Sequence, residues 1–577
     1  MILSVLGRLS GLALLAAVWQ ADAAPAPLCS THATPPSCTS PQTGPEVAVD
    51  APAGQWQRWE MDGGSHAYAI SLFGPDGTLL RYWPGAHNGT QDLAWVTPAA
   101  GVYRLQAQLL DFETAPAPRW TLRQQTPAAP AAGCAGDAAH TRLQSPALQQ
   151  LHKQLAQADA AQATALMSAF WQDIQTRGAP LLEATAHPDE VLVTFLWRAP
   201  SGTEGQPHCV TLDWAMRSES SVDLQPLPGS DLWHASVMLP RGAKLSYQLV
   251  VDPQLPAAAP HAVGSREQRM QGRAVATQRD TLNPQRWHAG AAGLDAAGPA
   301  ALHAQRSVLE IPQDGELRNV ARDLPSQALT EGTLHHWRFH SALMQDARSL
   351  SLYLPKGNQA PGSLPLLVLF DREPYLARTR IDAQLDQWIR QRLVPPMAML
   401  LVSNPSRAAR GQELPPDHPA FGRMLTAELL PSIRHRYPQL TQQAAQTVVA
   451  GSSYGGLAAG WLGWSHPEVF GKVLSLSGSY WWGPSDGAAR WAERDWVIRQ
   501  IAQGPLKPVR WFLSYGLLER GVQGAGGIVD NNRHLRNVLQ AKGYPVTTHE
   551  YGGGHDYYVW GDEILLGLQT LLETGPR

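Results

Sequence analysis

The first part of the chain alternates apolar and polar residues with a period of two, in short runs separated by turn-forming residues. Such runs cover residues 67–73, 78–80 and 102–109, and Gly-Pro-Asp-Gly at residues 74–77 marks a turn between the first two. A period of two places successive side chains on opposite faces of a strand, and Gly, Pro and Asp favour turn geometry. The pattern predicts an antiparallel β-sandwich, which we place at residues 40–127.

The middle of the chain changes to a helical period and then returns to strand-like runs. Residues 126–137 are rich in Pro, Ala and Gly, as in a linker, and residues 145–176 repeat apolar positions at spacings of three and four. The second pattern predicts one connecting amphipathic helix. Strand-like apolar runs then cover residues 191–198, 231–240 and 245–252. We therefore predict a β domain that, together with the connecting helix, spans residues 140–300.

Beyond residue 307, strand-like and helical patterns alternate. The strand-like runs are 350–354, 364–370 and 398–402, and the helical ones are 380–391 and 418–437. Such alternation produces a sheet covered by helices on both faces. The fold prediction is of the α/β class for residues 301–577, preceded by two β-sandwich-type domains. The histidines within residues 335–340 alternate along a predicted strand, which we favour over a metal cluster.

The N-terminus has the pattern of a secretory signal peptide. Arg8 precedes the apolar residues 12–19, and Ala21-Asp22-Ala23 forms a small-x-small cleavage site. We expect residues 1–23 to be removed and the protein to be periplasmic or secreted. No membrane insertion and no lipid anchor are expected, because no other apolar stretch is long enough and Leu28 precedes Cys29 where a lipoprotein site needs a small residue.

Charge and cysteine content limit the possible partners. The 45 Lys and Arg residues against 48 Asp and Glu residues leave a formal charge of −3, which gives no general attraction to nucleic acid. Cys29, Cys38, Cys134 and Cys209 make an even count, suited to disulfides in an oxidising compartment. Three pairings are possible, of which we favour Cys29 with Cys38 and Cys134 with Cys209. A zinc site is the rival interpretation, and the spacings lack the C-x-x-C pairs typical of one.

One pentapeptide carries the candidate chemistry. Gly451-Ser452-Ser453-Tyr454-Gly455 matches G-x-S-x-G, with the apolar residues 447–450 before it and a helical pattern after it. Strand, sharp turn and helix are the context of a nucleophile elbow, so Ser453 is the predicted nucleophile. A Gly/Ser-rich turn without chemistry is the alternative.

A serine nucleophile needs a base and a carboxylate that orients the base. His555, in the loop Gly552-Gly553-Gly554-His555, is the predicted base. Glu519, after the strand-like residues 509–515, is the predicted acid, while Asp530 and Asp556 remain alternatives. The order serine, acid, histidine is that of α/β-hydrolases, so we predict an α/β-hydrolase catalytic domain at residues 301–577. The oxyanion hole is expected to use the backbone N–H of Tyr454 and that of Arg372 or a neighbour.

Several segments resemble the enterochelin (ferric enterobactin) esterase family, over roughly residues 175–577. The catalytic segments are 448–457, 466–471, 475–482 and 553–556, and the upstream ones are 195–198, 231–233 and 280–284. The chain resembles a periplasmic-type member with an extra N-terminal β domain. That extra domain, residues 40–127, is similar to the bacterial pre-peptidase C-terminal-type domain.

The resemblance implies hydrolysis of the serine ester bonds of a ferric tricatecholate siderophore. The iron belongs to the substrate, and no metal or other cofactor is implied for the enzyme. Arg407 and Arg410 match a basic loop of the family, Arg372 could add positive charge, and Trp481 and Trp482 could stack on catechol rings. The family commonly has Asp-Gly where this chain has Asp371-Arg372, which bears on the oxyanion hole and on substrate preference.

Two further functions stay open at this point. The same triad could cleave phenolic or other acyl esters. A third interpretation, from another class, is a siderophore- or glycan-binding protein that keeps the fold without turnover. The number of ester bonds cut, the role of the first β domain and the oligomeric state are not determined by the sequence.

Overall fold

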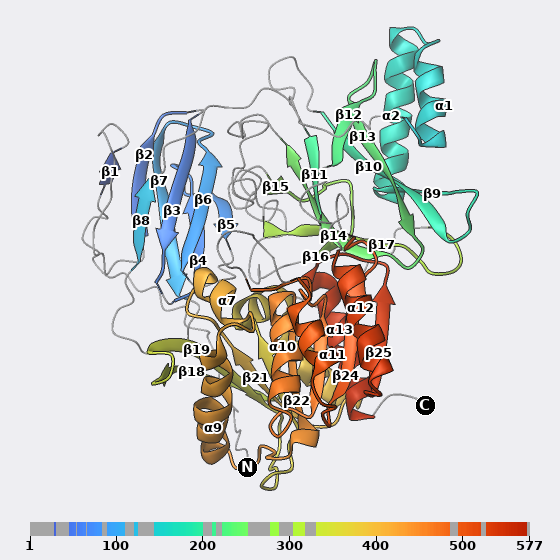
Figure 1. The fold of residues 1–577 in the computed structure, drawn as a ribbon. Coiled ribbons are helices and arrows are strands. Elements are labelled where there is room, and N and C mark those ends of the chain that lie inside the picture. Colours follow the sequence, from blue (N-terminus) through green and yellow to red (C-terminus); the bar gives the residue numbers. More distant parts are fainter. Residues whose placement is uncertain are drawn as a thin grey trace, which may run out of the picture.

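The computed structural model describes most of the chain in three parts that follow one another in sequence (Figure 1). The described residues are 28–30, 46–109 without 54, 65 and 84–88, 120–124, 143–199, 210–214, 222–251, 277–287, 304–317, 330–484, 494–520 and 527–573. The expected signal peptide, the predicted linker and the side chains of all four cysteines lie outside them. Among the helices described, none is both long and apolar enough to cross a bilayer.

The first part is a sandwich of two antiparallel-rich sheets. One sheet has the order β1 (Leu28–Ser30), β2 (Glu46–Ala51), β7 (Gly101–Leu109), β4 (Tyr68–Phe73), β5 (Leu79–Trp83), and the other β6 (Thr90–Val96), β3 (Trp56–Asp62), β8 (Thr121–Gln124). Trp59 and Tyr103 are fully buried between them. The alternating runs at 67–73 and 102–109 correspond to β4 and β7. Their residues alternate because every second side chain points inward and supplies this core.

Two helices, rather than the one connecting helix expected, join the first part to the second. They are α1 (Pro146–Leu155) and α2 (Ala160–Arg177). The break occurs because Asp159 caps α2: its side chain accepts the Gln162 backbone N–H while the Gln162 side chain accepts the Asp159 N–H. Leu148 and Leu151 of α1 pack with Trp171 of α2 in one cluster.

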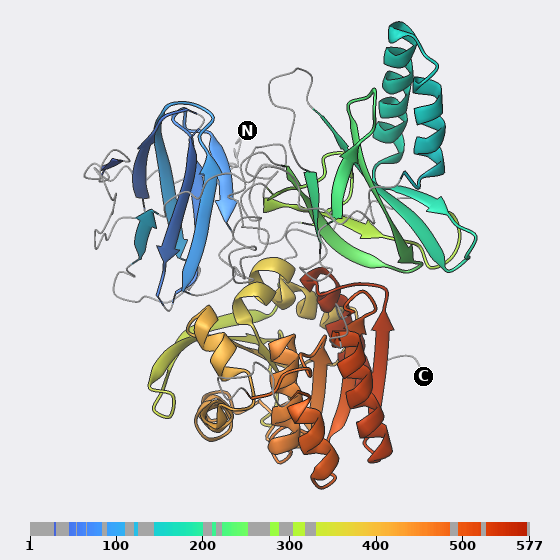
Figure 2. The same cartoon turned by 45° about the horizontal axis from the view of Figure 1, so that its top comes forward.

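The second part is a curled β-sheet. Its strands, in sheet order, are β16 (Arg286–Trp287), β17 (Arg306–Glu310), β14 (Lys244–Val251), β11 (Val210–Trp214), β12 (Val222–Pro226), β13 (Leu232–Pro240), β10 (Glu190–Arg198) and β9 (Leu181–Ala184), and β15 (Thr277–Gln278) also pairs with β14. Phe195 of β10 contacts the rings of Trp214 and Tyr247 at centroid distances of 5.8 and 4.9 Å. Since β10 does not neighbour β11 or β14, the sheet must curl to bring these aromatic side chains into one core, as Figure 2 shows.

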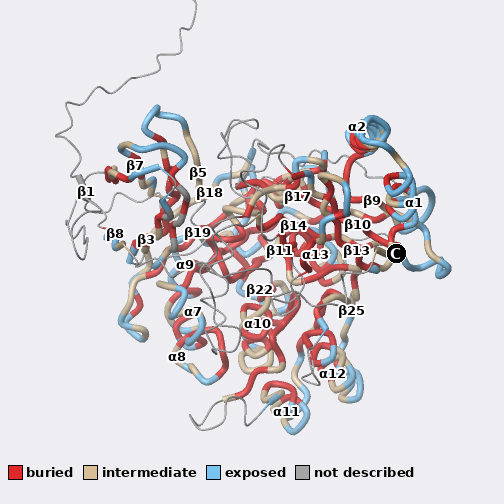
Figure 3. The backbone as a smooth tube through the Cα atoms, turned by 90° about the horizontal axis from the view of Figure 1, so that it is seen from above, coloured by how far each residue is buried: buried red, intermediate tan, exposed pale blue. Residues whose placement is uncertain are grey.

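The third part is an α/β-hydrolase fold around an eight-stranded sheet. In order, its strands are β18 (Thr333–Ser341), β19 (Asp346–Leu354), β21 (Ala398–Val402), β20 (Leu366–Phe370), β22 (Thr447–Ser452), β23 (Lys472–Leu476), β24 (Arg510–Gly516) and β25 (Val546–Tyr551). Pairing is parallel from β21 to β25. The central strands β20, β21 and β22 are buried along their whole length, as expected for strands covered on both faces. Figure 3 shows buried residues gathered at the centre of the molecule and exposed ones at its periphery.

Helices cover both faces of this sheet. On one face α6 (Ile381–Arg390) and α13 (Tyr557–Leu572) share a core with Leu367 and Leu474. On the other lie α9 (Leu430–Arg436), α10 (Tyr454–Ser465), α11 (Trp496–Gln503) and α12 (Ile528–Ala541). The helix predicted at 418–437 is a succession of α8 (Pro419–Arg423), the π-helical η3 (Met424–Leu429) and α9. The shorter elements are α5 (Arg372–Pro374), the π-helical η2 (Tyr375–Thr379), α7 (Arg407–Glu413) and the 3₁₀ turn η4 (Ala444–Gln446).

Candidate active site

Ser453 lies in a strained turn between β22 and α10. Its φ and ψ are 59° and −119°, a conformation that a non-glycine residue rarely adopts. A β-carbon at Gly451 would lie 2.5 Å from the carbonyl carbon of Gly455, so the tightness of the turn requires glycine there. The strand, turn and helix expected around the pentapeptide are therefore present, with Ser453 at the sharpest point.

The segment after β23 packs beside this turn. Ser453 donates its backbone N–H to the Leu476 carbonyl at 2.9 Å, and Ser479 donates its own to the Ser453 carbonyl at 3.0 Å. The hydroxyl oxygens of Ser453 and Ser479 are 3.4 Å apart. The elbow is thus held on both sides of the nucleophile candidate by main-chain bonds to residues 476–479.

Glu519 and His555 contact each other through a short hydrogen bond beyond the carboxyl ends of the parallel strands. Glu519 Oε1 lies 2.5 Å from His555 Nδ1, and Glu519 is 1% exposed. Its other oxygen accepts the Ser477 hydroxyl and the Gly516 backbone N–H, both at 2.8 Å. Glu519 follows β24 and His555 follows β25, so both leave the carboxyl ends of strands parallel to the one that carries Ser453.

The two alternative acids have other roles in the structure. Asp530 accepts the Gly527 backbone N–H at the start of α12. Asp556 accepts the backbone N–H groups of Ser246 and Tyr558. The geometry therefore favours Glu519 as the carboxylate that orients His555, and it leaves the second ring nitrogen, Nε2, to act on a substrate.

Ser477 and Tyr551 complete the surroundings of the Glu519 carboxylate, and neither was expected from the sequence. The Ser477 hydroxyl lies 3.1 Å from the Tyr551 hydroxyl and accepts the Trp560 indole N–H at 3.1 Å. Burial, reinforced by the negative charge of Glu519, raises the pKa of Tyr551 well above its ordinary value, so the phenol stays neutral. No local pattern marked these residues, because they meet Glu519 through tertiary contacts.

The two proposed oxyanion donors begin helices. Tyr454 is the first residue of α10, and Arg372 is the first residue of α5, which follows β20 directly. The positive φ of 62° in this turn falls on Asp371, and Arg372 is absent from the residues with positive φ. The replacement of the family's glycine by Arg372 therefore imposes no backbone strain at that position.

The expectation that Arg372 adds positive charge to the site is wrong. Its side chain is 3% exposed, donates Nε to the Ser351 hydroxyl at 2.6 Å and pairs with Glu373 at 3.0 Å. The guanidinium needs these partners because a buried charge without them would be costly. What the position can offer a substrate is its backbone N–H.

Of the two arginines on α7, Arg407 is exposed and Arg410 is bound to Asp371. Arg410 Nε and Nη2 lie 2.5 and 2.7 Å from the two Asp371 carboxylate oxygens. Burial lowers the pKa of Arg410, but the negative charge of Asp371 and its hydrogen bonds raise the pKa by more than burial lowers it. The net shift is upward, so the arginine stays charged. The Arg410 guanidinium also lies 6.0 Å above the Tyr454 ring. Its charge is balanced by Asp371, and Arg407 is the more accessible cation.

The two candidate tryptophans also differ in how far they are buried. Trp481 is partly buried and packs on Tyr454 at a centroid distance of 5.9 Å, beside the elbow. Trp482 is 7% exposed and its ring meets Trp496 edge to face at 6.2 Å. The expectation that Trp482 stacks on a substrate is wrong, because the tryptophan is part of the core between sheet and helices. For Trp481 that role remains a prediction.

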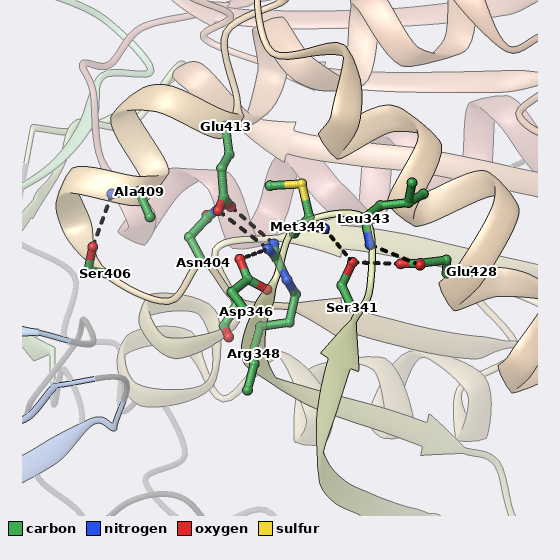
Figure 4. Close-up of polar contacts among 12 residues, drawn as sticks. Ser341, Leu343, Met344, Asp346, Arg348, Asn404, Ser406, Ala409, Glu413 and Glu428 are labelled. Atoms are coloured by element: carbon green, nitrogen blue, oxygen red, sulfur yellow. Dashed lines mark hydrogen bonds and ion pairs between the residues drawn. The ribbon is translucent and has the colours of Figure 1, made fainter.

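A buried polar cluster fixes α7 (Figure 4). Arg348 of β19 is fully buried and donates to both carboxylate oxygens of Glu413, at 3.0 and 3.3 Å, and to Asp346. The Asn404 amide also donates to Glu413, at 2.6 Å. Because Glu413 ends α7, this cluster sets the position of the helix that carries Arg410. In the part of the chain that the structure describes, no group of three His, Cys, Asp or Glu side chains is placed to hold a metal ion.

Comparisons with known proteins match two segments of the chain to known families. Residues 341–571 match the family described as putative esterase, and residues 192–313 match the N-terminal domain of enterochelin esterase. Neither match includes the N-terminal sandwich.

The similar proteins cover most of the chain. The iron(III) enterobactin esterase of Dickeya dadantii is 29% identical over 426 residues, which is 70% of this chain and 92% of that protein. The iron(III) salmochelin esterase of an Escherichia coli strain is 28% identical over 412 residues, 70% of this chain and 93% of its own.

Solved structures are similar over the same share of the chain. The ferric enterobactin esterase of Salmonella typhimurium superposes with a TM-score of 0.55 at 25% identity, over 70% of this chain and 98% of that one. An enterobactin esterase of Shigella flexneri, solved in the presence of enterobactin, has a TM-score of 0.52 at 25% identity over the same shares.

Proposed function

The chain belongs to the enterochelin esterase family and is an esterase, and from this premise we propose that it uses Ser453 to hydrolyse the ester bonds of ferric catecholate siderophores. The observation that carries the serine mechanism is the Glu519–His555 pair. The pair and the strained turn with Ser453 both follow the carboxyl ends of parallel strands in the same sheet. The substrate class is supported by relatives named for iron(III) enterobactin and iron(III) salmochelin.

The reaction begins with proton transfer from Ser453 to His555 Nε2 as the serine oxygen attacks the ester carbonyl. Glu519 holds the Nδ1–H side of the ring and stabilises the imidazolium without accepting the proton. The negative oxygen that develops is met by the Tyr454 N–H at the start of α10 and by the N–H of residue 372.

Attack of the serine oxygen gives a tetrahedral intermediate, and collapse of this intermediate breaks the ester bond. His555 returns the proton to the departing serine alcohol of the siderophore, and an acyl group stays on Ser453. Water, activated by the same imidazole, then hydrolyses the acyl-enzyme. Opening of the trilactone, the ring of three serine esters in the siderophore, weakens the hold of the chelator on iron. The iron belongs to the substrate throughout.

Recognition of a polyanionic, aromatic substrate is assigned to two features of the elbow's surroundings. Arg407 supplies an exposed positive charge at the start of α7. Trp481, whose ring packs on Tyr454 in a tilted arrangement, supplies an aromatic face close to Ser453.

Incubation of the purified protein and its Ser453→Ala variant with ferric enterobactin tests the proposal. Separation of the linear trimer, dimer and monomer by chromatography should show products with the wild type and none with the variant. Cleavage of feruloyl or simple aryl esters with no action on the siderophore would favour an esterase for phenolic esters. Tight siderophore binding without turnover by the wild type would favour a binding protein.

We also propose that the protein acts outside the cytoplasm, on the basis of residues 1–23. Expression of the full chain in a Gram-negative host, followed by fractionation and N-terminal sequencing, should give a periplasmic protein that begins near residue 24. A cytoplasmic protein with an intact N-terminus would refute this.

A further inference from the structure

The loop that carries His555 is bonded to the preceding β domain. Lys244, the first residue of β14, donates its backbone N–H to the Gly552 carbonyl at 2.6 Å, and Lys244 and Gly553 form a parallel β-bridge. The loop therefore continues the sheet of the β domain for one residue pair. In Figure 1, β14 and β17 lie against the end of the catalytic domain from which α13 begins.

Asp556, the residue after His555, makes a second connection. Its Oδ2 accepts the Ser246 backbone N–H of β14 at 2.7 Å, and its Oδ1 accepts the Tyr558 N–H at the start of α13 at 3.0 Å. The residue is 6% exposed. One buried carboxylate thus joins the β domain, the histidine loop and the first turn of the last helix.

The glycines of the loop are needed for this contact. A β-carbon at Gly552 would lie 3.0 Å from the Ala243 Cα, and one at Gly553 would lie 2.7 Å from the Lys244 carbonyl oxygen. The backbone of the β domain therefore approaches the loop too closely for side chains. The Gly-Gly-Gly segment is explained at these two positions by contact with another domain.

Side chains close the same interface around the loop. The Tyr558 hydroxyl donates to Glu310 of β17 at 2.6 Å, and the Tyr558 ring packs on Trp287 of β16 at 5.6 Å. At its edge, Lys244 Nζ lies 3.3 Å from Asp562 of α13, with both side chains partly exposed.

We propose that the β domain is part of the catalytic apparatus, with Asp556 as the positioning residue that holds His555 at the correct distance from Ser453. This inference rests on the proposed function, since it assigns His555 the role of base. His555 lies between two anchors, the Lys244 bridge at residue 553 and the Ser246 bond at Asp556. Catalysis depends on the position of the base, so a displacement of the His555 ring by about 1 Å would lower the rate by as much as roughly a hundredfold.

The test compares Asp556→Ala and Asp556→Asn with the control Asp562→Asn in the full chain. Asp562 belongs to the helix that Asp556 caps, and it pairs with the Lys244 side chain at the edge of the same interface. The readouts are kcat and KM for ferric enterobactin, the rate at which a fluorophosphonate labels Ser453, and thermal unfolding to show that each variant is folded.

We expect Asp556→Ala to lower both kcat and the labelling rate by roughly 10- to 100-fold with KM changed less than about threefold. Asp556→Asn keeps one acceptor oxygen and should recover part of both rates, and Asp562→Asn should match the wild type. The proposal is overturned if Asp556→Ala keeps wild-type kcat, if KM alone changes, or if Asp562→Asn loses as much. Should Asp556→Ala not fold, Asp556→Asn decides: a lowered kcat supports the proposal and a wild-type kcat refutes it.

Failure of the proposed function would look different. A wild type that is labelled at Ser453 but leaves ferric enterobactin intact refutes the substrate, and the labelling rates still test Asp556. Wild-type labelling of a His555→Ala variant refutes the triad and this proposal with it.

Discussion

Glu519 Oε1 and His555 Nδ1 are 2.5 Å apart, although the two residues are separated by 36 positions and follow different strands. The Glu519 carboxylate is buried and held by Ser477 and Gly516, so it reaches the imidazole in one fixed orientation. In the proposed mechanism this pair makes Ser453 a nucleophile.

Replacement of Glu519 by Gln should lower kcat by roughly 10³- to 10⁴-fold with little change in KM, because the neutral amide no longer stabilises the imidazolium and favours the wrong tautomer. Steady-state kinetics on ferric enterobactin measure this. Asp530→Asn is the matched control, since Asp530 is exposed and caps α12, and it should stay within about twofold of the wild type. Equal losses in both variants would contradict the assignment of the acid.

Replacement of Gly451 by Ala should abolish activity and lower the free energy of unfolding by more than about 2 kcal/mol, because the new methyl group would lie 2.5 Å from the Gly455 carbonyl group. Denaturant unfolding and esterase assays check this. Gly411→Ala is the contrasting variant. Gly411 lies in α7, where an added β-carbon would meet no atom within 4 Å apart from its own helix backbone, so the change should stabilise by about 0.5–1 kcal/mol. Retained activity in Gly451→Ala would argue against a strained elbow.

Replacement of Arg348 by Met should lower the free energy of unfolding by about 3–5 kcal/mol, because Glu413 would remain buried with its negative charge unpaired. The double variant Arg348→Met with Glu413→Gln should recover part of this loss. Urea unfolding of the wild type, both single variants and the double variant gives the coupling energy. Strictly additive losses would show that the two side chains do not depend on each other.

Replacement of Arg407 by Ala should raise KM for the anionic siderophore several-fold at low salt with kcat unchanged, and the effect should shrink as NaCl is added. Replacement of Arg410 by Ala should instead lower kcat, because it leaves the buried Asp371 carboxylate without its partner beside the elbow. Kinetics at two NaCl concentrations separate the two cases. An effect of Arg407→Ala that is independent of salt would contradict a role in electrostatic attraction.

The contribution of His549 to stability should depend on pH. Its Nδ1 lies 2.8 Å from Glu563, and this hydrogen bond raises the pKa of His549 while burial opposes the shift. A raised folded-state pKa stabilises the protein below the unfolded value of about 6.5, and the gain is lost as pH rises through the folded value. The difference in unfolding free energy between the wild type and His549→Gln should therefore be larger at pH 5.5 than at pH 8.5. The same difference at both values would refute the coupling.

Several features followed from local sequence alone. The G-x-S-x-G pentapeptide between an apolar run and a helical pattern predicted the elbow, and the alternation beyond residue 307 predicted a sheet covered by helices on both faces. Backbone strain, glycine and hydrophobic period are local properties. The break at Asp159 and the π-helical stretch at Met424–Leu429 were missed, because capping bonds and helix widening leave the apolar period nearly unchanged.

The order of residues along the chain was enough to identify the groups that carry the proposed chemistry: a serine in a strained turn, a later carboxylate and a histidine in a glycine loop. The roles of their neighbours were set by contacts between distant parts of the folded chain. In the folded chain Arg372 and Trp482 are buried. Arg410 is paired with Asp371, and Asp556 contacts the β domain. Burial and ion pairing depend on groups far away in the chain, so the same arginine or tryptophan can face a substrate or belong to the core.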